Sequence, residues 1–188
     1  MKKIFVFAVA ALCICACGNS KKNKTVEAET VVELSAADSL DIQYAANLLP
    51  KGTKAPEFTI TNVNGQSVSL SDYAGKWLVI DFWASWCGDC RRDIPNIKAA
   101  YERFSPKGVE FLGVSFDDDR EAWVNAINDF ELPYTQVSEL KKWRSTDISP
   151  LYKLDWIPTM YVINPQGEVA LATVLSEKMT AFLAEVTE

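Results

Sequence analysis

Residues 78–95 read LVIDFWASWCGDCRRDIP, and the rest of the chain is best interpreted outward from this stretch. The run Leu78–Trp83 is apolar and rich in strand-forming residues, with Asp81 as its one charged member. After the second cysteine, apolar residues recur at the three- and four-residue steps of a helix: Ile94, Ile97, Tyr101 and Phe104. Cys87 and Cys90 are therefore predicted to lie where a buried strand ends and a helix begins.

This position favours thiol chemistry. The first turn of a helix offers unpaired N–H groups and the positive end of the helix dipole, and both stabilise a thiolate relative to a thiol. Because two residues separate the cysteines, Cys90 lies one helical turn beyond Cys87 and can close a small disulfide with it. The pattern predicts a dithiol active site whose redox group is the Cys87–Cys90 disulfide, and we expect no other cofactor.

The N-terminal residues have the features of an export signal. Two lysines precede the apolar run Ile4–Ala16, which is shorter than the about 20 residues that span a bilayer. The sequence Ile14-Cys15-Ala16-Cys17 resembles a bacterial lipobox, in which Cys17 is acylated and becomes the new N-terminus. We therefore expect a signal peptide over residues 1–17 and a lipid-anchored protein of the cell envelope that faces the periplasm. The alternative is a plain signal peptide cut near Gly18.

Cysteine and histidine usage narrows the chemistry. If Cys13 and Cys15 leave with the signal peptide and Cys17 carries lipid, only Cys87 and Cys90 remain as thiols, which favours redox chemistry over structural disulfides. The chain has no histidine, which excludes a His-assisted nucleophile, His metal ligands and a haem-attachment motif. Two cysteines alone make a poor zinc site, so we expect no bound metal.

Composition limits the partners. Hydrophobic residues make up 48% of the 188-residue chain, enough for a buried core. The formal net charge of −6 becomes −8 when the two N-terminal lysines are removed. An acidic chain without a basic patch is not expected to bind nucleic acid, so membrane contact should come from the lipid. We expect a monomer.

Beyond the signal, residues 18–50 are polar and then weakly helical, and we expect a tether that contains one short helix. Residues 51–188 are expected to form the domain, which begins with a β-hairpin around Asn64-Gly65. The three acids Asp117–Asp119 are interpreted as an N-cap and dipole complement for the next helix rather than as a cation site. The other expected elements are strands at 109–115, 134–137, 159–163 and 168–174 and helices at 149–153 and near 179–186. The order predicts an α/β fold: a central mixed β-sheet with helices on both faces and an extra N-terminal hairpin.

Two separate motifs of the chain resemble those of a known family. The run Asp81–Cys90, followed downstream by Ile157-Pro158-Thr159, resembles thioredoxin. The hairpin, the long insert between Ser115 and Trp156 and the sequence Val162–Gly167 are similar to those of the exported, membrane-tethered TlpA/ResA-like (AhpC/TSA-type) thioredoxins. The resemblance covers about residues 51–188 and implies a thioredoxin-like fold.

The resemblance also implies roles for individual residues. Cys87 matches the nucleophile and Cys90 the resolving thiol. Pro158 matches the family's cis-proline, which would bring the backbone of Ile157 alongside a substrate peptide added as a strand. Trp86 is expected to pack over the cysteines and limit access to them.

Two acids near the cysteines are interpreted differently. Asp81, an acid in an apolar strand, should have a raised pKa, and its match to thioredoxin's buried aspartate implies that it accepts the proton of Cys90. The alternative is an acid that only hydrogen-bonds in the core. Asp89 stands where thioredoxin has proline, and its charge should disfavour the Cys87 thiolate, with the two arginines after Cys90 offsetting part of the effect. We therefore expect a reducing potential, nearer the about −270 mV of thioredoxin than the about −120 mV of DsbA.

Together these features predict an exported thiol–disulfide oxidoreductase that reduces protein disulfides in the envelope and is itself reduced by a membrane electron donor. Three alternatives remain. An AhpC-type peroxidase would carry Thr three residues before the reactive cysteine, where this chain has Ala84. A copper carrier related to Sco proteins would need CxxxC and a histidine. A tethered binding module would leave the cysteines idle.

Overall fold

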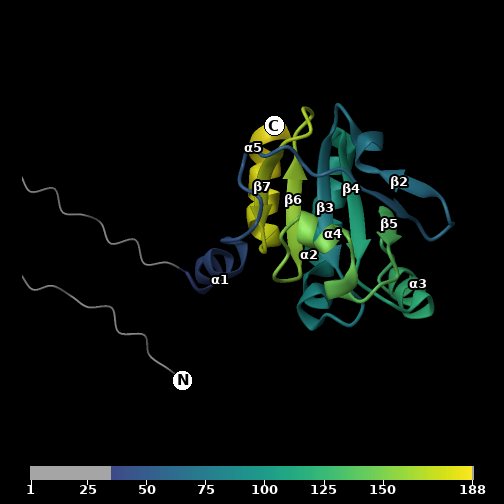
Figure 1. Ribbon diagram of the computed structural model, residues 1–188. Helices are drawn as coiled ribbons and strands as arrows, with labels where there is room; N and C mark the ends of the chain where they lie inside the picture. The colour runs from purple at the N-terminus through teal and green to yellow at the C-terminus, as the bar shows by residue number, and fades with distance from the viewer. Residues whose placement is uncertain (1–34, 188) are drawn as a thin grey trace, which may run out of the picture. The chain divides into compact units, whose positions relative to one another are not determined.

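Five strands of mixed direction form the centre of the fold in the computed structural model, which describes residues 35–187 (Figure 1). The strand order is β5-β4-β3-β6-β7, with β3, β4 and β5 parallel and with β6 antiparallel to both β3 and β7. The bounds are β3 Trp77–Trp83, β4 Val109–Ser115, β5 Thr135–Ser138, β6 Thr159–Ile163 and β7 Val169–Thr173. The predicted mixed sheet is confirmed, and β3 is its central strand.

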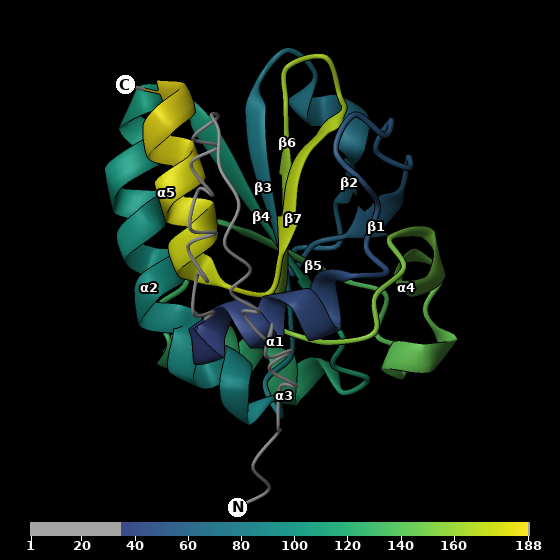
Figure 2. The same cartoon turned by 90° about the vertical axis from the view of Figure 1, so that its left-hand side faces the viewer.

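Both faces of this sheet are covered. On one face, α2 (Gly88–Phe104) and α5 (Ser176–Thr187) lie side by side over Val79 and Met160 (Figure 2). The other face packs against α3 (Arg120–Asp129), α4 (Ile148–Leu151) and the hairpin of β1 (Thr59–Thr61) and β2 (Ser67–Ser69). Short 3-10 helices complete the chain: η1 Leu70–Tyr73, η2 Ser105–Lys107 and η3 Trp143–Ser145. The helices on both faces and the N-terminal hairpin were predicted.

The predicted tether over residues 18–50 differs from the structure in its second half. Helix α1 (Ala36–Ala45) packs against the domain: Asp41 accepts hydrogen bonds from the Thr173 hydroxyl at 2.6 Å and the Val174 N–H at 2.9 Å. Leu48 and Leu49, which follow, are buried. The packed region therefore begins before the predicted boundary, because a partly buried carboxylate and two buried leucines fix a segment whose sequence has no clear apolar stripe.

The remaining N-terminal predictions, the signal peptide over 1–17 and lipid on Cys17, lie outside the described residues. Within residues 35–187, no helix combines the length and apolar character needed to cross a bilayer.

Candidate active site

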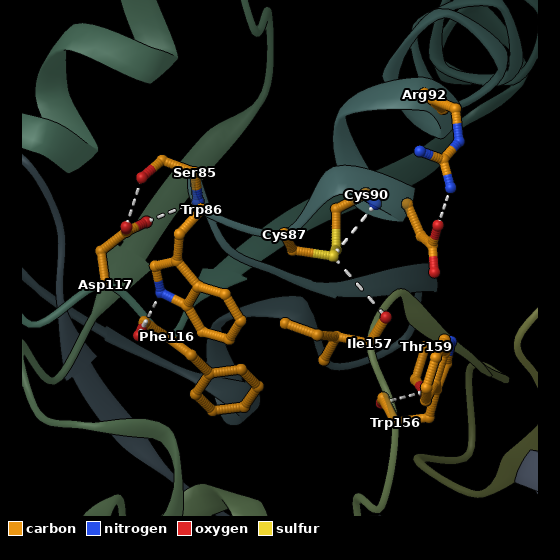
Figure 3. Close-up of a disulfide and its surroundings, with 11 residues drawn as sticks. Ser85, Trp86, Cys87, Cys90, Arg92, Phe116, Asp117, Trp156, Ile157 and Thr159 are labelled. Carbon is orange, nitrogen blue, oxygen red and sulfur yellow. Dashed lines mark hydrogen bonds and ion pairs between the residues drawn. A yellow bond between two sulfur atoms is a disulfide. The ribbon is translucent and has the colours of Figure 1, made fainter.

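Cys87 and Cys90 form a disulfide at the start of α2, with their Cα atoms 5.3 Å apart (Figure 3). Cys87 is the N-cap residue of the helix, and its Sγ accepts a hydrogen bond from the Cys90 N–H at 3.1 Å. Cys87 is 7% exposed and Cys90 only 2%. The predicted pairing at a strand-to-helix junction is confirmed, and an incoming molecule meets Cys87 before Cys90.

The peptide bond between Ile157 and Pro158 is cis, as the resemblance implied. The carbonyl oxygen of Ile157 lies 3.6 Å from Cys87 Sγ (Figure 3). The turn is braced by the Thr159 hydroxyl, which donates to the Trp156 carbonyl at 2.7 Å. The structure thus places the backbone of Ile157 directly beside the sulfur that faces outward.

Asp89 and Asp81 have different environments. Asp89, in the first turn of α2, forms an ion pair with Arg92, which partly neutralises the charge expected to oppose a thiolate (Figure 3). Asp81 is buried beneath α2, on the same face of β3 as Val79, and accepts a hydrogen bond from the Tyr134 hydroxyl at 3.0 Å. Asp89 therefore lies at the surface of the site, and Asp81 lies in the core beneath it.

Burial raises the pKa of Asp81 to about 7; the Tyr134 hydrogen bond lowers it, and the nearby charge of Asp93 raises it. Burial, together with Asp81, also raises the pKa of Tyr134 well above its ordinary value, so its hydroxyl remains a donor. A carboxyl group with this pKa can take up and release a proton near neutral pH.

The Gln136 side chain fills space left by a glycine that the sequence pattern did not single out. Gly113 of β4 lies between Asp81 and Gln136 in the sheet register, and a Cβ on it would collide with the Gln136 side chain. Gln136 in turn accepts a hydrogen bond from the Trp83 indole N–H at 3.0 Å. These residues and Tyr134 form a buried polar layer under α2, which only the pairing of three strands brings together.

Asp117 holds the turn that leads into Cys87. It is 2% exposed and accepts hydrogen bonds from the Ser85 N–H at 3.0 Å and the Ser85 hydroxyl at 2.5 Å (Figure 3). It also accepts one from the Ser115 hydroxyl at 2.6 Å. The expectation that all three acids Asp117–Asp119 complement a helix is therefore wrong for Asp117. Asp119 does cap α3, through the Ala122 N–H at 2.8 Å.

Trp86 lies on the surface beside the cysteines. It is 52% exposed, and its indole N–H donates to the Phe116 carbonyl at 3.4 Å (Figure 3). Its ring lies 6.4 Å from that of Trp143, which stacks on Phe116 at 5.7 Å. Trp86 therefore belongs to an aromatic surface on one side of the site.

Asp93 of α2 is a further acid that sequence reasoning missed. Its Oδ1 accepts hydrogen bonds from the Ser176 hydroxyl at 2.5 Å and the Asn96 amide at 2.9 Å. Its Oδ2 is buried and has no hydrogen-bond partner among the described residues. One signal was available: Asp93 lies one helical turn after Cys90 on the same helix.

Comparison with known proteins places this site in a family. The family model for AhpC/TSA proteins matches residues 51–172. The thiol-disulfide oxidoreductase ResA of Bacillus cereus is 26% identical over 139 residues, covering 72% of this chain and 78% of that protein. ResA of Bacillus subtilis is 30% identical over 123 residues, covering 64% of this chain and 65% of that protein.

Solved structures agree with this placement. The thioredoxin domain of a thiol-disulfide oxidoreductase from Bacteroides vulgatus superposes with a TM-score of 0.69 at 29% identity, covering 74% of this chain and 99% of that one. A thiol-disulfide oxidoreductase from Bacteroides fragilis gives a TM-score of 0.67 at 29% identity, covering 71% of this chain and 99% of that one. With the cysteine pair at the start of α2, these matches show that the chain belongs to the AhpC/TSA family and is a thiol–disulfide oxidoreductase with a thioredoxin-like fold.

Proposed function

We propose that this oxidoreductase is exported and reduces disulfides of proteins in the cell envelope, with Cys87 as the nucleophile and Cys90 as the resolving thiol. The observation that supports this assignment best is the asymmetry of the pair. Cys87 caps α2 and faces the Ile157 carbonyl, whereas Cys90 is almost completely buried.

The first step is attack on the substrate. In the reduced protein, the Cys87 thiolate attacks one sulfur of a substrate disulfide, a Cys87–substrate bond forms and the substrate S–S bond breaks. The leaving substrate sulfur takes up a proton. The N–H of Cys90 and the helix dipole stabilise the thiolate before the attack.

The second step resolves the mixed disulfide. The Cys90 thiol gives its proton to the Asp81 carboxylate and attacks Cys87 Sγ, and the second substrate sulfur leaves and is protonated. The substrate has then gained two electrons, and the protein holds the Cys87–Cys90 disulfide. A membrane electron donor with a dithiol would return the two electrons.

The substrate's backbone has a place to bind. A polypeptide laid beside the Ile157–Pro158 turn can pair with the Ile157 backbone as an added strand, which brings its disulfide to Cys87. Trp86 offers an exposed aromatic surface on the opposite side of the sulfur.

Reduction of insulin in the presence of dithiothreitol tests the proposed activity. The protein is expected to accelerate precipitation of the insulin B chain, and Cys87→Ser is expected to abolish the acceleration. The AhpC-type alternative predicts consumption of hydrogen peroxide at a rate that depends on Cys87, without insulin reduction. The idle-cysteine alternative predicts neither.

Lipid attachment at Cys17, with residues 1–17 as the signal, is tested separately. Labelled palmitate is expected to enter the wild-type chain in bacterial cells, and Cys17→Ser is expected to remove the label and release the protein from membranes. Labelling that persists in Cys17→Ser would contradict acylation at this residue. A wild-type chain that takes up no label would contradict the proposal and favour the plain signal peptide cut near Gly18.

A further inference from the structure

A cavity of about 470 Å³ opens next to the cis-proline turn. Helix α1 crosses the end of β7, close to the start of α5, and forms one wall of this cavity (Figure 2). The apolar lining is Leu40, Tyr44, Trp156, Pro158, Val174 and Leu175. The cavity is thus continuous with the place where a substrate strand would lie.

The α1 wall is firmly attached. Asp41 is held by Thr173 and Val174, and Lys178 contacts Asp41 at 3.0 Å and Asp38 at 3.1 Å. The Tyr44 ring stacks on Trp156, with centroids 4.2 Å apart and planes 24° from parallel. Through Trp156, α1 therefore supports the turn that carries Pro158.

The polar part of the cavity is acidic. Its lining includes Asp89, Asp93 and Glu177, against the single base Arg92, which is paired with Asp89. The cavity therefore combines an apolar wall, on which Leu40 is 48% exposed, with a polar side on which acids outnumber the one base.

We propose that this cavity binds the substrate polypeptide next to its reactive disulfide, taking one apolar side chain against α1 and a neighbouring lysine or arginine against the acids. This inference rests on the proposed reductase function and specifies its substrate: a disulfide flanked by apolar and basic residues. Helix α1 is then part of the substrate-binding site, and Leu40 and Glu177 determine specificity.

The test uses the full-length reduced protein and short disulfide peptides of three kinds. Their cysteines are flanked by leucine and lysine, by serine and lysine, or by leucine and glutamate, and kcat/KM is measured for each. The wild type is expected to prefer leucine–lysine over serine–lysine by about tenfold, and over leucine–glutamate by about fivefold. Leu40→Ser should remove the first preference and Glu177→Gln should reduce the second. Ile42→Ser, at a 57% exposed position of α1 that does not line the cavity, is the matched control and should change neither.

The outcomes separate this inference from the proposed function. If no peptide and no small disulfide is reduced, the proposed function itself fails. If a small disulfide is reduced but the three peptides react equally, the function stands and the substrate inference is overturned. Equal effects of Ile42→Ser and Leu40→Ser would also overturn it. Faster reaction of all peptides with Leu40→Ser would overturn it as well, because it would indicate that another segment of this chain covers the cavity.

Discussion

The carboxyl group of Asp81 is buried against the Tyr134 hydroxyl, and burial raises its pKa to about 7. An unfolded aspartate has a pKa of about 3.9, so between these values the folded protein binds the proton more tightly than the unfolded chain does. The free energy of unfolding contributed by Asp81 therefore falls as pH rises from about 4 to about 7 and stays low above that. Asp81 thus lowers stability at the pH at which we propose that it serves as a base.

Asp81→Asn tests both roles of this residue. The variant keeps an acceptor for Tyr134 but carries no charge, so it should be more stable than the wild type at pH 8, by on the order of 2 to 4 kcal/mol, and close to it at pH 4. Resolution of the mixed disulfide on Cys87 should slow about 100-fold at neutral pH, because Cys90 loses its base. Urea unfolding at both pH values and stopped-flow kinetics give the two readings. An unchanged resolution rate would leave Asp81 as a structural acid only.

Asp117 is expected to contribute to the free energy of unfolding, whereas the neighbouring acid is not. Asp117→Ala leaves the Ser85 N–H and two serine hydroxyls without their acceptor next to the active site, so it should lower the free energy of unfolding by about 2 to 3 kcal/mol. The neighbour Asp118 is exposed, and Asp118→Ala should stay within about 0.5 kcal/mol of the wild type. Equal effects in urea unfolding would contradict the assigned role of Asp117.

Residues whose chemistry is local were predictable from the sequence. The cysteines, Asp81 and the proline of Ile157-Pro158 each stand in a short motif with a recognisable neighbourhood. Tyr134 and Asp117 could not be predicted, because their roles come from partners 53 and 32 residues away, Asp81 and Ser85. A carboxylate that follows a strand looks the same in sequence whether it caps a helix or braces a turn.

Strand β4 has a glycine, Gly113, at a position where the Gln136 side chain leaves no room for a Cβ atom. Gly113→Ala would place a methyl group against Gln136, which is fixed by Trp83, and should destabilise the protein by about 1 to 3 kcal/mol. Gln136→Ala removes the obstacle but also the partner of the Trp83 indole. The double variant should therefore be more stable than the sum of the two single changes predicts, as thermal unfolding can measure. Strict additivity would show that the two residues do not interfere.

Helices and strands were predicted well where one face of an element is apolar. The strands Val109–Ser115 and Thr159–Ile163 match their predicted bounds. Helix α1 was expected only as part of a tether, because Asp41 and Tyr44 attach it through a partly buried carboxylate and a ring stack rather than through an apolar stripe. Such contacts have no periodic signature.

The redox potential measures the difference in free energy between the disulfide and dithiol forms of the protein, and the whole site contributes to it. We expect a value nearer about −270 mV than about −120 mV. Asp89→Asn should shift it by about 10 to 20 mV towards the oxidising side, because the substitution frees Arg92 to stabilise the Cys87 thiolate at a partly exposed site. Glu102→Gln, an exposed change late in α2, serves as the control for net charge. Equilibration with glutathione buffers would give the values, and a shift in the reducing direction would contradict the role given to Asp89.

The central claim is that Cys87 attacks and Cys90 resolves. Mass spectrometry of protein complexes from cells that express Cys90→Ser or Cys87→Ser tests it most directly. Cys90→Ser is predicted to accumulate substrates linked covalently to Cys87, and Cys87→Ser is predicted to trap none, because Cys90 is only 2% exposed. Equal trapping by both variants, or trapping by Cys87→Ser alone, would contradict the account.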